Sequence, residues 1–235
     1  MLPDQLPSSG VAEPAAHLVR WQRLLFLFLA VSGAIVALSL FLPRGFTYVS
    51  EEANLPTWWT VSLLVGAAGL HVQAGLLARR SGSRGAVSWW LLAALLAMLS
   101  LDELAGLHER LQELVLVLTD TRFVFAWVVL GIPIAIAVTG FTLVVARHLP
   151  RPSTLLSVGG IGILLASAVG LEAVGSLILA DQPILSRGSD LGYILVTHLE
   201  EFGEMAGAAL AACSPLAALR LRGVSTDFGV SLAAR

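Results

Sequence analysis

The chain has 235 residues, of which 57% are hydrophobic and only 13% are charged. Because soluble globular domains carry about 25% charged residues, this composition excludes an ordinary water-soluble fold. The formal net charge of −2 gives no reason to expect a nucleic-acid partner, and the single cysteine, Cys213, excludes an intrachain disulfide.

The start of the chain does not have the features of a cleaved secretory signal. Residues 1–17 contain Asp4, Glu13 and three prolines, and they lack a basic beginning. We predict a disordered cytoplasmic tail over residues 1–20 and a transmembrane domain over residues 21–220. A second cytoplasmic tail is expected over residues 221–235.

Apolar stretches recur along the whole transmembrane domain. Each is long enough to cross about 30 Å of hydrocarbon as a helix of roughly 20 residues. The predicted fold class is therefore all-α, a polytopic bundle of six transmembrane helices without a sheet. The spans are expected at residues 21–42, 57–78, 86–106, 123–146, 154–180 and 191–219.

The arginines predict the orientation of these spans, since the chain contains no lysine. Cytoplasmic loops of membrane proteins carry an excess of basic residues. One side of the predicted bundle receives most of them, namely Arg20, Arg23, Arg79, Arg80, Arg84, Arg147, Arg151, Arg220, Arg222 and Arg235. The other side receives Arg44, Arg110, Arg122 and Arg187. We therefore expect a multi-pass protein of a bacterial inner membrane with both termini in the cytoplasm.

The third span is expected to continue beyond the membrane surface as one helix. Apolar residues keep helical spacing through a charged stretch at Leu104, Leu107, Leu111, Leu114, Val115 and Leu118. This pattern predicts an amphipathic extension that lies on the outer surface or projects from it. On such a continuous helix, Asp102, Glu109 and Glu113 share one stripe with Gly106.

Four of the six spans contain ionisable residues, which are costly in hydrocarbon and mark functional sites by default. They are His71, Asp102, Glu103, Glu172, His198, Glu200, Glu201 and Glu204. At about 1.5 Å per residue, the carboxylates of three helices fall in the outer half of the membrane, and His71 falls at the lower edge of that layer. His108 follows directly after the third span.

No arginine or lysine accompanies the six carboxylates inside the spans, so they need protons or a cation. Carboxylates beside histidines, without a thiol, suit Zn, Fe or Mn. We therefore predict a divalent or transition-metal site, with Glu200 and Glu204 as proton-handling catalytic groups. Its predicted ligands are Asp102, Glu103, His108, Glu172, His198, Glu201, Glu204 and His71. Alternatively, the outer-loop residues Arg110, Arg122 and Arg187 supply the positive charge.

These groups also have purely structural interpretations. Glu200 and Glu201 reach the outer interface if the sixth helix begins later than expected. The acidic residues at the end of the third span form a solvated face beside Arg110 if they lie outside the bilayer. A lone histidine such as His71 is more often an interhelical hydrogen-bonding residue than a ligand. A protonated, hydrogen-bonded Glu172 needs no cation.

Three functions fit this pattern. The leading hypothesis is a metal-binding membrane protein, including a metal-dependent enzyme that acts on a lipid or a small molecule. A proton- or cation-coupled transporter that uses the same acids as a relay is the first alternative. The second is an accessory subunit whose acids bind a partner. Membrane lipids are expected partners in each case, and the sequence does not give the oligomeric state.

Two segments of the chain resemble a known group of sequences. Their motifs are Ser100-Leu101-Asp102-Glu103 with Leu107-His108-Glu109-Arg110-Leu111, and Leu199-Glu200-Glu201 with Glu204-Met205. The pairing is similar to a loosely defined group of uncharacterised polytopic bacterial membrane proteins, and this resemblance implies no activity. The chain differs from the seven-span ceramidase and adiponectin-receptor hydrolases, because their C-terminal His-x-x-x-His has no counterpart here.

Overall fold

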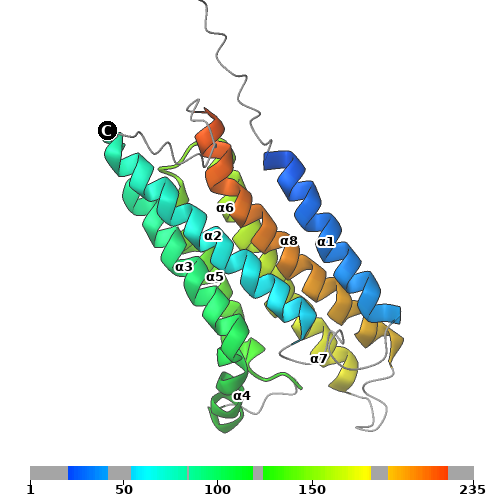
Figure 1. The fold of residues 1–235 in the computed structure, drawn as a ribbon. Helices are drawn as coiled ribbons and strands as arrows, with labels where there is room; N and C mark the ends of the chain where they lie inside the picture. The colour runs from blue at the N-terminus through cyan, green and yellow to red at the C-terminus, as the bar shows by residue number, and fades with distance from the viewer. Residues whose placement is uncertain (1–20, 42–53, 84, 119–123, 181–189, 222–235) are drawn as a thin grey trace, which may run out of the picture.

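The computed structural model describes residues 21–41, 54–83, 85–118, 124–180 and 190–221, which form a bundle of helices without any strand (Figure 1). The first four helices are α1 (Trp21–Phe41), α2 (Leu55–Arg80), α3 (Ala86–Ala105) and α4 (Leu107–Leu118). They are followed by α5 (Val128–Ala146), α6 (Arg151–Leu165), the π-helical segment η1 (Ala166–Leu171), α7 (Glu172–Ala180) and α8 (Leu191–Leu221).

Within the described residues, six helical segments are long and apolar enough to cross a membrane. They are Trp21–Phe41, Leu55–Arg80, Ala86–Ala105, Val128–Ala146, Arg151–Ala180 and Leu191–Leu219. Large apolar side chains such as Phe26, Phe41 and Ile136 are exposed on the outside of the bundle, where hydrocarbon solvates them. The prediction of an all-α, six-span fold is confirmed, as expected for a multi-pass membrane protein.

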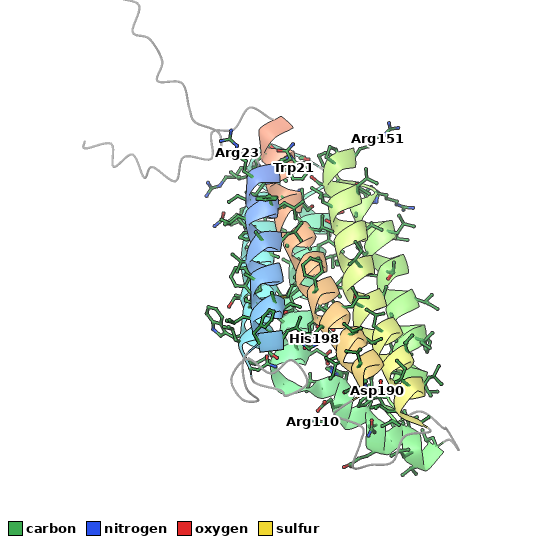
Figure 2. The ribbon with its side chains drawn as sticks, turned by 90° about the vertical axis from the view of Figure 1, so that its right-hand side faces the viewer. Trp21, Arg23, Arg110, Arg151, Asp190 and His198 are labelled. Carbon is green, nitrogen blue, oxygen red and sulfur yellow. The ribbon has the colours of Figure 1, made fainter. Side chains whose placement is uncertain are left out.

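The two ends of the bundle differ in charge. α1 begins and α8 ends at the same end (Figure 1). Arg23 and Arg151 lie at this end, whereas Arg110 on α4 lies at the other (Figure 2). We call the first the arginine-rich end, because the hairpin from α2 to α3 also brings Arg79 and Arg80 there. The second is called the α4 end. The predicted tails, 1–20 and most of 221–235, lie outside the described residues.

The predicted start of the fourth span is too early. α5 begins at Val128, and residues 124–127 form turns. The hydroxyl of Ser176 on α7 accepts hydrogen bonds from the backbone N–H groups of Val124 and Phe125. The Ser176 hydroxyl therefore satisfies backbone N–H groups that would have no partner in the first turn of a helix.

The third span does not continue as one helix, so that expectation was wrong. α3 ends at Ala105, and Gly106 adopts a left-handed conformation with φ 54° and ψ 43°. This conformation favours glycine and ends helices, because a Cβ would crowd the following carbonyl oxygen. The chain then turns into α4, which runs across the α4 end of the bundle (Figure 2). The amphipathic segment therefore exists as a separate helix.

α8 is the central helix, and it packs against α1, α2, α6, η1 and α7. Its crossing with α6 is close, since a Cβ built on Gly207 would lie 2.5 Å from the carbonyl oxygen of Gly160. A Cβ on Gly203 would overlap the Ser167 side chain in η1. Small residues beside the acidic face of α8 therefore permit close helix approach.

The bundle has an apolar core that extends toward the arginine-rich end. It contains side chains of α2, α3, α5, α6 and α8, including Leu64, Leu92, Leu96, Ile161, Ala209 and Ala212. On α8 the core residues follow Glu204 toward the arginine-rich end. The acidic residues of the spans are therefore separated from that end by packed apolar side chains.

Candidate functional site

An acidic cavity of about 500 Å³ lies in the half of the bundle nearer the α4 end. All the helical segments except α1 contribute to its wall. The acidic lining residues are Asp102, Glu103, Glu109, Glu172, Glu200, Glu201 and Glu204. His108 is the histidine of the lining, and the described lining residues include no Arg or Lys. Seven of the nine predicted site residues thus share one cavity, whereas His71 and His198 do not line it.

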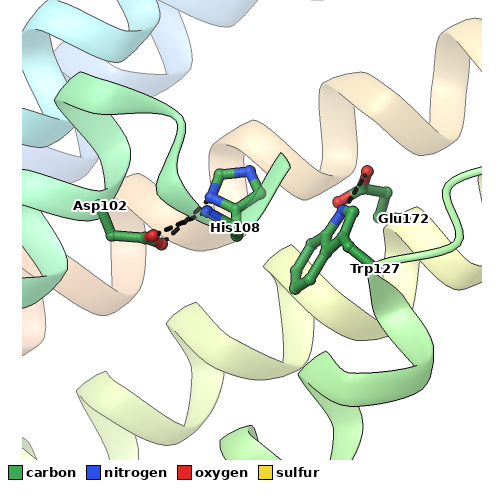
Figure 3. Close-up of polar contacts among 4 residues, drawn as sticks. All are labelled: Asp102, His108, Trp127 and Glu172. Atoms are coloured by element: carbon green, nitrogen blue, oxygen red, sulfur yellow. Dashed lines mark hydrogen bonds and ion pairs between the residues drawn. The ribbon is translucent and has the colours of Figure 1, made fainter. Parts of the chain in front are cut away.

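Asp102 joins the end of α3 to the start of α4. Its Oδ1 accepts a hydrogen bond of 3.0 Å from the backbone N–H of His108, and its Oδ2 lies 3.1 Å from Nδ1 of the same residue (Figure 3). A carboxylate at the first turn of a helix satisfies an open N–H donor and interacts favourably with the helix dipole. Asp102 is therefore a structural residue of the corner as well as part of the cavity wall.

His108 links this corner to the other side of the cavity. Its ring lies 4.7 Å from that of Trp127, measured between centroids, and Trp127 Nε1 donates a hydrogen bond of 2.8 Å to Glu172 Oε1 (Figure 3). A row of four side chains, Asp102, His108, Trp127 and Glu172, thus connects α3, α4, the turn before α5, and α7. We call this row the corner network.

The charge state of His108 is set by opposing influences. Burial lowers the pKa of the imidazole, but the hydrogen bond and the negative charge of Asp102 raise it, with further contributions from Glu172 and Glu103. The net result is that the pKa of His108 lies above its ordinary value. The raised pKa favours the protonated, cationic form of His108 beside the acids of the cavity wall.

A π-helical segment precedes Glu172. η1 occupies Ala166–Leu171, and its wider turns change the direction in which the following residues point. Ser167 of η1 is buried against Gly203 of α8, so the irregular turn fits where α8 has no side chain. Glu172 follows directly and lines the cavity. Such segments often occur at functional sites, and no sequence pattern indicated this one.

α8 supplies the three deepest acids. Glu200, Glu201 and Glu204 lie on adjacent turns, so one broad face presents all of them to the cavity. Glu204 is 9% exposed, and Oε2 of Glu201 is buried without a hydrogen-bond partner. Glu103 and Glu172 are close enough for their charges to act on Glu204. Acids from three spans therefore interact across the cavity.

His71 lies in the apolar core and not with the acids. It is fully buried, its Nδ1 donates a hydrogen bond of 2.8 Å to the carbonyl oxygen of Ala67, and its ring packs 5.3 Å from that of Trp89. Trp89 is in the first turn of α3, about 20 Å along that helix from Asp102. His71 is 16 residues after the start of α2, or about 24 Å, which agrees with its predicted place at the lower edge of the acidic layer, but its side chain packs against Trp89 and does not line the cavity.

His198 shares α8 with the acids but faces elsewhere. Its Nδ1 donates a hydrogen bond of 2.6 Å to the carbonyl oxygen of Ile194, and its Nε2 is buried without a partner. Its three-residue spacing from Glu201 therefore does not bring its side chain into the cavity wall. Spacing gives the face of α8 on which His198 lies, but the neighbouring helices decide what that face contacts.

The described residues contain no group of three or more His, Cys, Asp or Glu side chains positioned to hold a metal ion. The acids line a common space without forming a ready-made ligand set. Arg110 is exposed on α4 and is not part of the lining, whereas Arg122 and Arg187 lie outside the described residues. Glu113 is likewise exposed and does not line the cavity.

Sequence reasoning missed several uncharged residues of the cavity. Trp127 holds Glu172, and the other polar or aromatic lining residues include Thr57, Thr60, Phe125, Tyr193 and Thr197. Tyr193 lies about two turns and Thr197 about one turn before Glu201 on α8, so helical spacing from the acids could have identified them. Trp127 had no comparable signal, because a tryptophan near a span end usually indicates the membrane interface.

Comparison with known proteins adds a family but no activity. No curated protein and no solved structure matches the chain. Residues 23–219, which include all the cavity residues, match a family described as a domain of unknown function. This match covers the transmembrane bundle from α1 to α8. The chain therefore belongs to the DUF8692 family.

Proposed function

We propose that this chain is an integral membrane protein that binds a cation in the acidic cavity. The observation that supports this function is the set of seven carboxylic residues around one cavity whose described lining includes no Arg or Lys. Carboxylates in a low-dielectric interior are stable only when protons or a cation offset their charge. Binding of a cation is therefore expected to displace protons from the cavity.

A divalent or transition metal, Zn, Fe or Mn, is the cation that the sequence predicts. Oxygen ligands suit Mn best among these, since the cavity wall supplies many carboxylates and one histidine. The acids would have to close around the ion, because the described residues hold no preformed ligand set. Glu200 and Glu204 are proposed to accept and release protons as the cation binds and leaves.

A binding pocket is favoured over a transport pathway. The apolar core packs between the acids and the arginine-rich end, so the cavity has a closed floor. Its volume falls within the range of 300–1,000 Å³ that is common for small-molecule sites. A metal-dependent enzyme acting on a lipid or small molecule is the second candidate, supported by the apolar walls beside the acids. We further propose that the membrane is a bacterial inner membrane, and the arginine distribution supports cytoplasmic termini.

The test is a calorimetric titration of the purified protein with MnCl₂ and, separately, ZnCl₂, repeated in buffers of different ionisation enthalpy to count released protons. We expect saturable binding of at least one ion with proton release. Glu201→Gln and Glu103→Gln should each weaken binding by about tenfold or more, which corresponds to about 1.4 kcal/mol. Glu113→Gln is the matched control, because Glu113 is exposed near the cavity without lining it.

Two outcomes would overturn the proposal. One is the absence of any saturable cation binding by the wild-type protein. The other is equal loss of binding in Glu113→Gln and Glu201→Gln, which would mean that diffuse surface charge attracts the ion. Elemental analysis after gentle extraction, compared between wild type and Glu201→Gln, identifies a metal that remains bound during purification.

A further inference from the structure

We infer that the ligand of the cavity is an amphiphilic cation that reaches it laterally from the membrane, between α3 and α5. This inference rests on the proposed cation binding, and it names an organic cation in place of a metal ion as the ligand, together with its route. Two independent observations support it: one side of the cavity wall is exposed at membrane depth, and the lining combines a cluster of acids with extensive apolar surface.

The exposed side of the wall belongs to neighbouring helices. Met98 on α3 and Ile134 on α5 both line the cavity, yet they are 69% and 50% exposed. Leu107 at the start of α4 lines the cavity and is exposed as well. These three residues therefore form a mouth, which we call the α3–α5 mouth.

The opposite wall is closed. Thr60 and Leu64 on α2 line the cavity and are each 1% exposed, and Leu164 and Leu165 at the end of α6 are buried. The back of the cavity is thus packed against neighbouring helices. The α3–α5 mouth is therefore the route that we propose for a ligand from the membrane.

The mouth lies within the hydrocarbon layer. Met98 is seven residues before the end of α3, and Ile134 is six residues after the start of α5. At about 1.5 Å per residue, both lie roughly 10 Å inside the α4 end of their helices. A hydrocarbon core of about 30 Å includes this depth. The mouth therefore faces lipid chains, while Asp102 lies one turn closer to the interface.

The lining specifies a ligand with two parts. Acids surround one region of the cavity, and Oε2 of Glu201, which is buried without a partner, is available to a cationic group. Leu95, Leu99 and Val138 continue the wall with apolar surface. A volume of about 500 Å³ greatly exceeds the roughly 30 Å³ of one water molecule, so a bare ion would leave most of it empty. A cationic head among the acids and an alkyl chain leaving through the mouth would satisfy both regions.

The first experiment measures ligand class in the full-length protein reconstituted in phosphatidylcholine nanodiscs, with empty nanodiscs subtracted. Radiolabelled dodecyltrimethylammonium is compared with dodecanol and dodecyl sulfate of equal chain length. We expect saturable binding of the cation alone, weakened about tenfold or more by Glu201→Gln and unchanged by Glu113→Gln. Equal binding of dodecanol would overturn the assignment of a cationic head.

The second experiment tests the route by measuring association rates. Met98→Trp and Ile134→Trp narrow the mouth and should slow association of dodecyltrimethylammonium by about tenfold. Ile136→Trp is the matched control, because Ile136 is 69% exposed on the same helix and does not line the cavity. Unchanged rates in both mouth variants would overturn the lateral route.

The two proposals can fail separately. If MnCl₂ binds with proton release but dodecyltrimethylammonium does not bind, the amphiphile inference is wrong and the cation-binding function stands. If neither probe binds, both are wrong. If the amphiphile binds and Met98→Trp keeps the wild-type affinity for Mn²⁺, both proposals are supported. The variant would then change the route without changing the acids that bind the charge.

Discussion

Asp102 shows how one side chain can contribute to both folding and a site. Its two carboxylate oxygens contact the backbone N–H and the ring of His108, so the α3–α4 corner depends on it. Substitutions of Asp102 therefore change the position of α4 along with the charge of the cavity. Glu201 is the better residue for testing cation binding, because its Oε2 is buried without a hydrogen-bond partner.

The raised pKa of His108 predicts a pH dependence of stability. Because the folded-state pKa lies above the unfolded value of about 6.5, protonation of His108 stabilises the fold fully below that pH. This contribution should be lost as pH rises through the folded-state pKa. Thermal unfolding of the purified protein is therefore expected to occur at a lower temperature as pH rises from about 6 toward 8.

Asp102→Asn removes the negative charge that raises the pKa of His108, so it should reduce this pH dependence. Glu113→Gln should leave it unchanged, because Glu113 does not contribute to the shift. A wild-type melting temperature that stays constant or rises across this range would contradict the predicted coupling. Direct titration of the His108 ring by NMR in wild type and Asp102→Asn would identify the group responsible.

At the scale of elements, the α3–α4 corner depends on one glycine. Gly106→Ala places a Cβ on a residue with φ 54°, which should cost about 1–2 kcal/mol and favour continuation of α3. Gly82, with φ 66°, is the matched control, since it has the same left-handed backbone conformation in the turn after α2. We expect both variants to unfold at lower temperature, measured by thermal denaturation, but only Gly106→Ala to weaken cation binding. Equal binding by the two variants would show that the corner does not position the acids.

The crossing of α6 and α8 gives a second prediction for elements. Gly207→Ala introduces a Cβ 2.5 Å from the carbonyl oxygen of Gly160, so the helices must separate. Overpacking of this kind costs about 1–3 kcal/mol. Gly159→Ala is the control, because a Cβ there meets nothing within 4 Å. Thermal denaturation in detergent should show a clear loss for Gly207→Ala and no loss for Gly159→Ala, and equal stability would contradict the close-packed crossing.

For the whole molecule, the central prediction concerns orientation. Since α1 begins and α8 ends at the arginine-rich end, both termini are expected in the cytoplasm and the acidic cavity near the outer surface (Figure 2). Reporter fusions after Arg235 and beside Pro183 measure this directly. A cytoplasmic signal from the first and a periplasmic signal from the second are expected. The opposite pattern would place the cavity on the cytoplasmic side.

The number and composition of the spans were readable from sequence, because the hydrocarbon thickness imposes a length and an apolar composition on every crossing segment. The acidic site residues could be predicted for the same reason, since Asp102, Glu172 and Glu204 interrupt apolar sequence. Their common cavity agreed with estimated depth along each helix. Depth along α2 did not show that the His71 side chain packs against Trp89, because packing between α2 and α3 selects that contact.

Thus the sequence by itself determined an all-α six-span bundle with acids in one half, since these features depend on local composition and helical rise. Only the tertiary structure decided which side chains share the cavity. The break at Gly106, the π-helical turn before Glu172 and the hydrogen bond from Trp127 each depend on contacts between distant segments. Helical spacing fixes the face of a residue relative to its own helix, whereas neighbouring helices decide whether that face meets lipid, core or cavity.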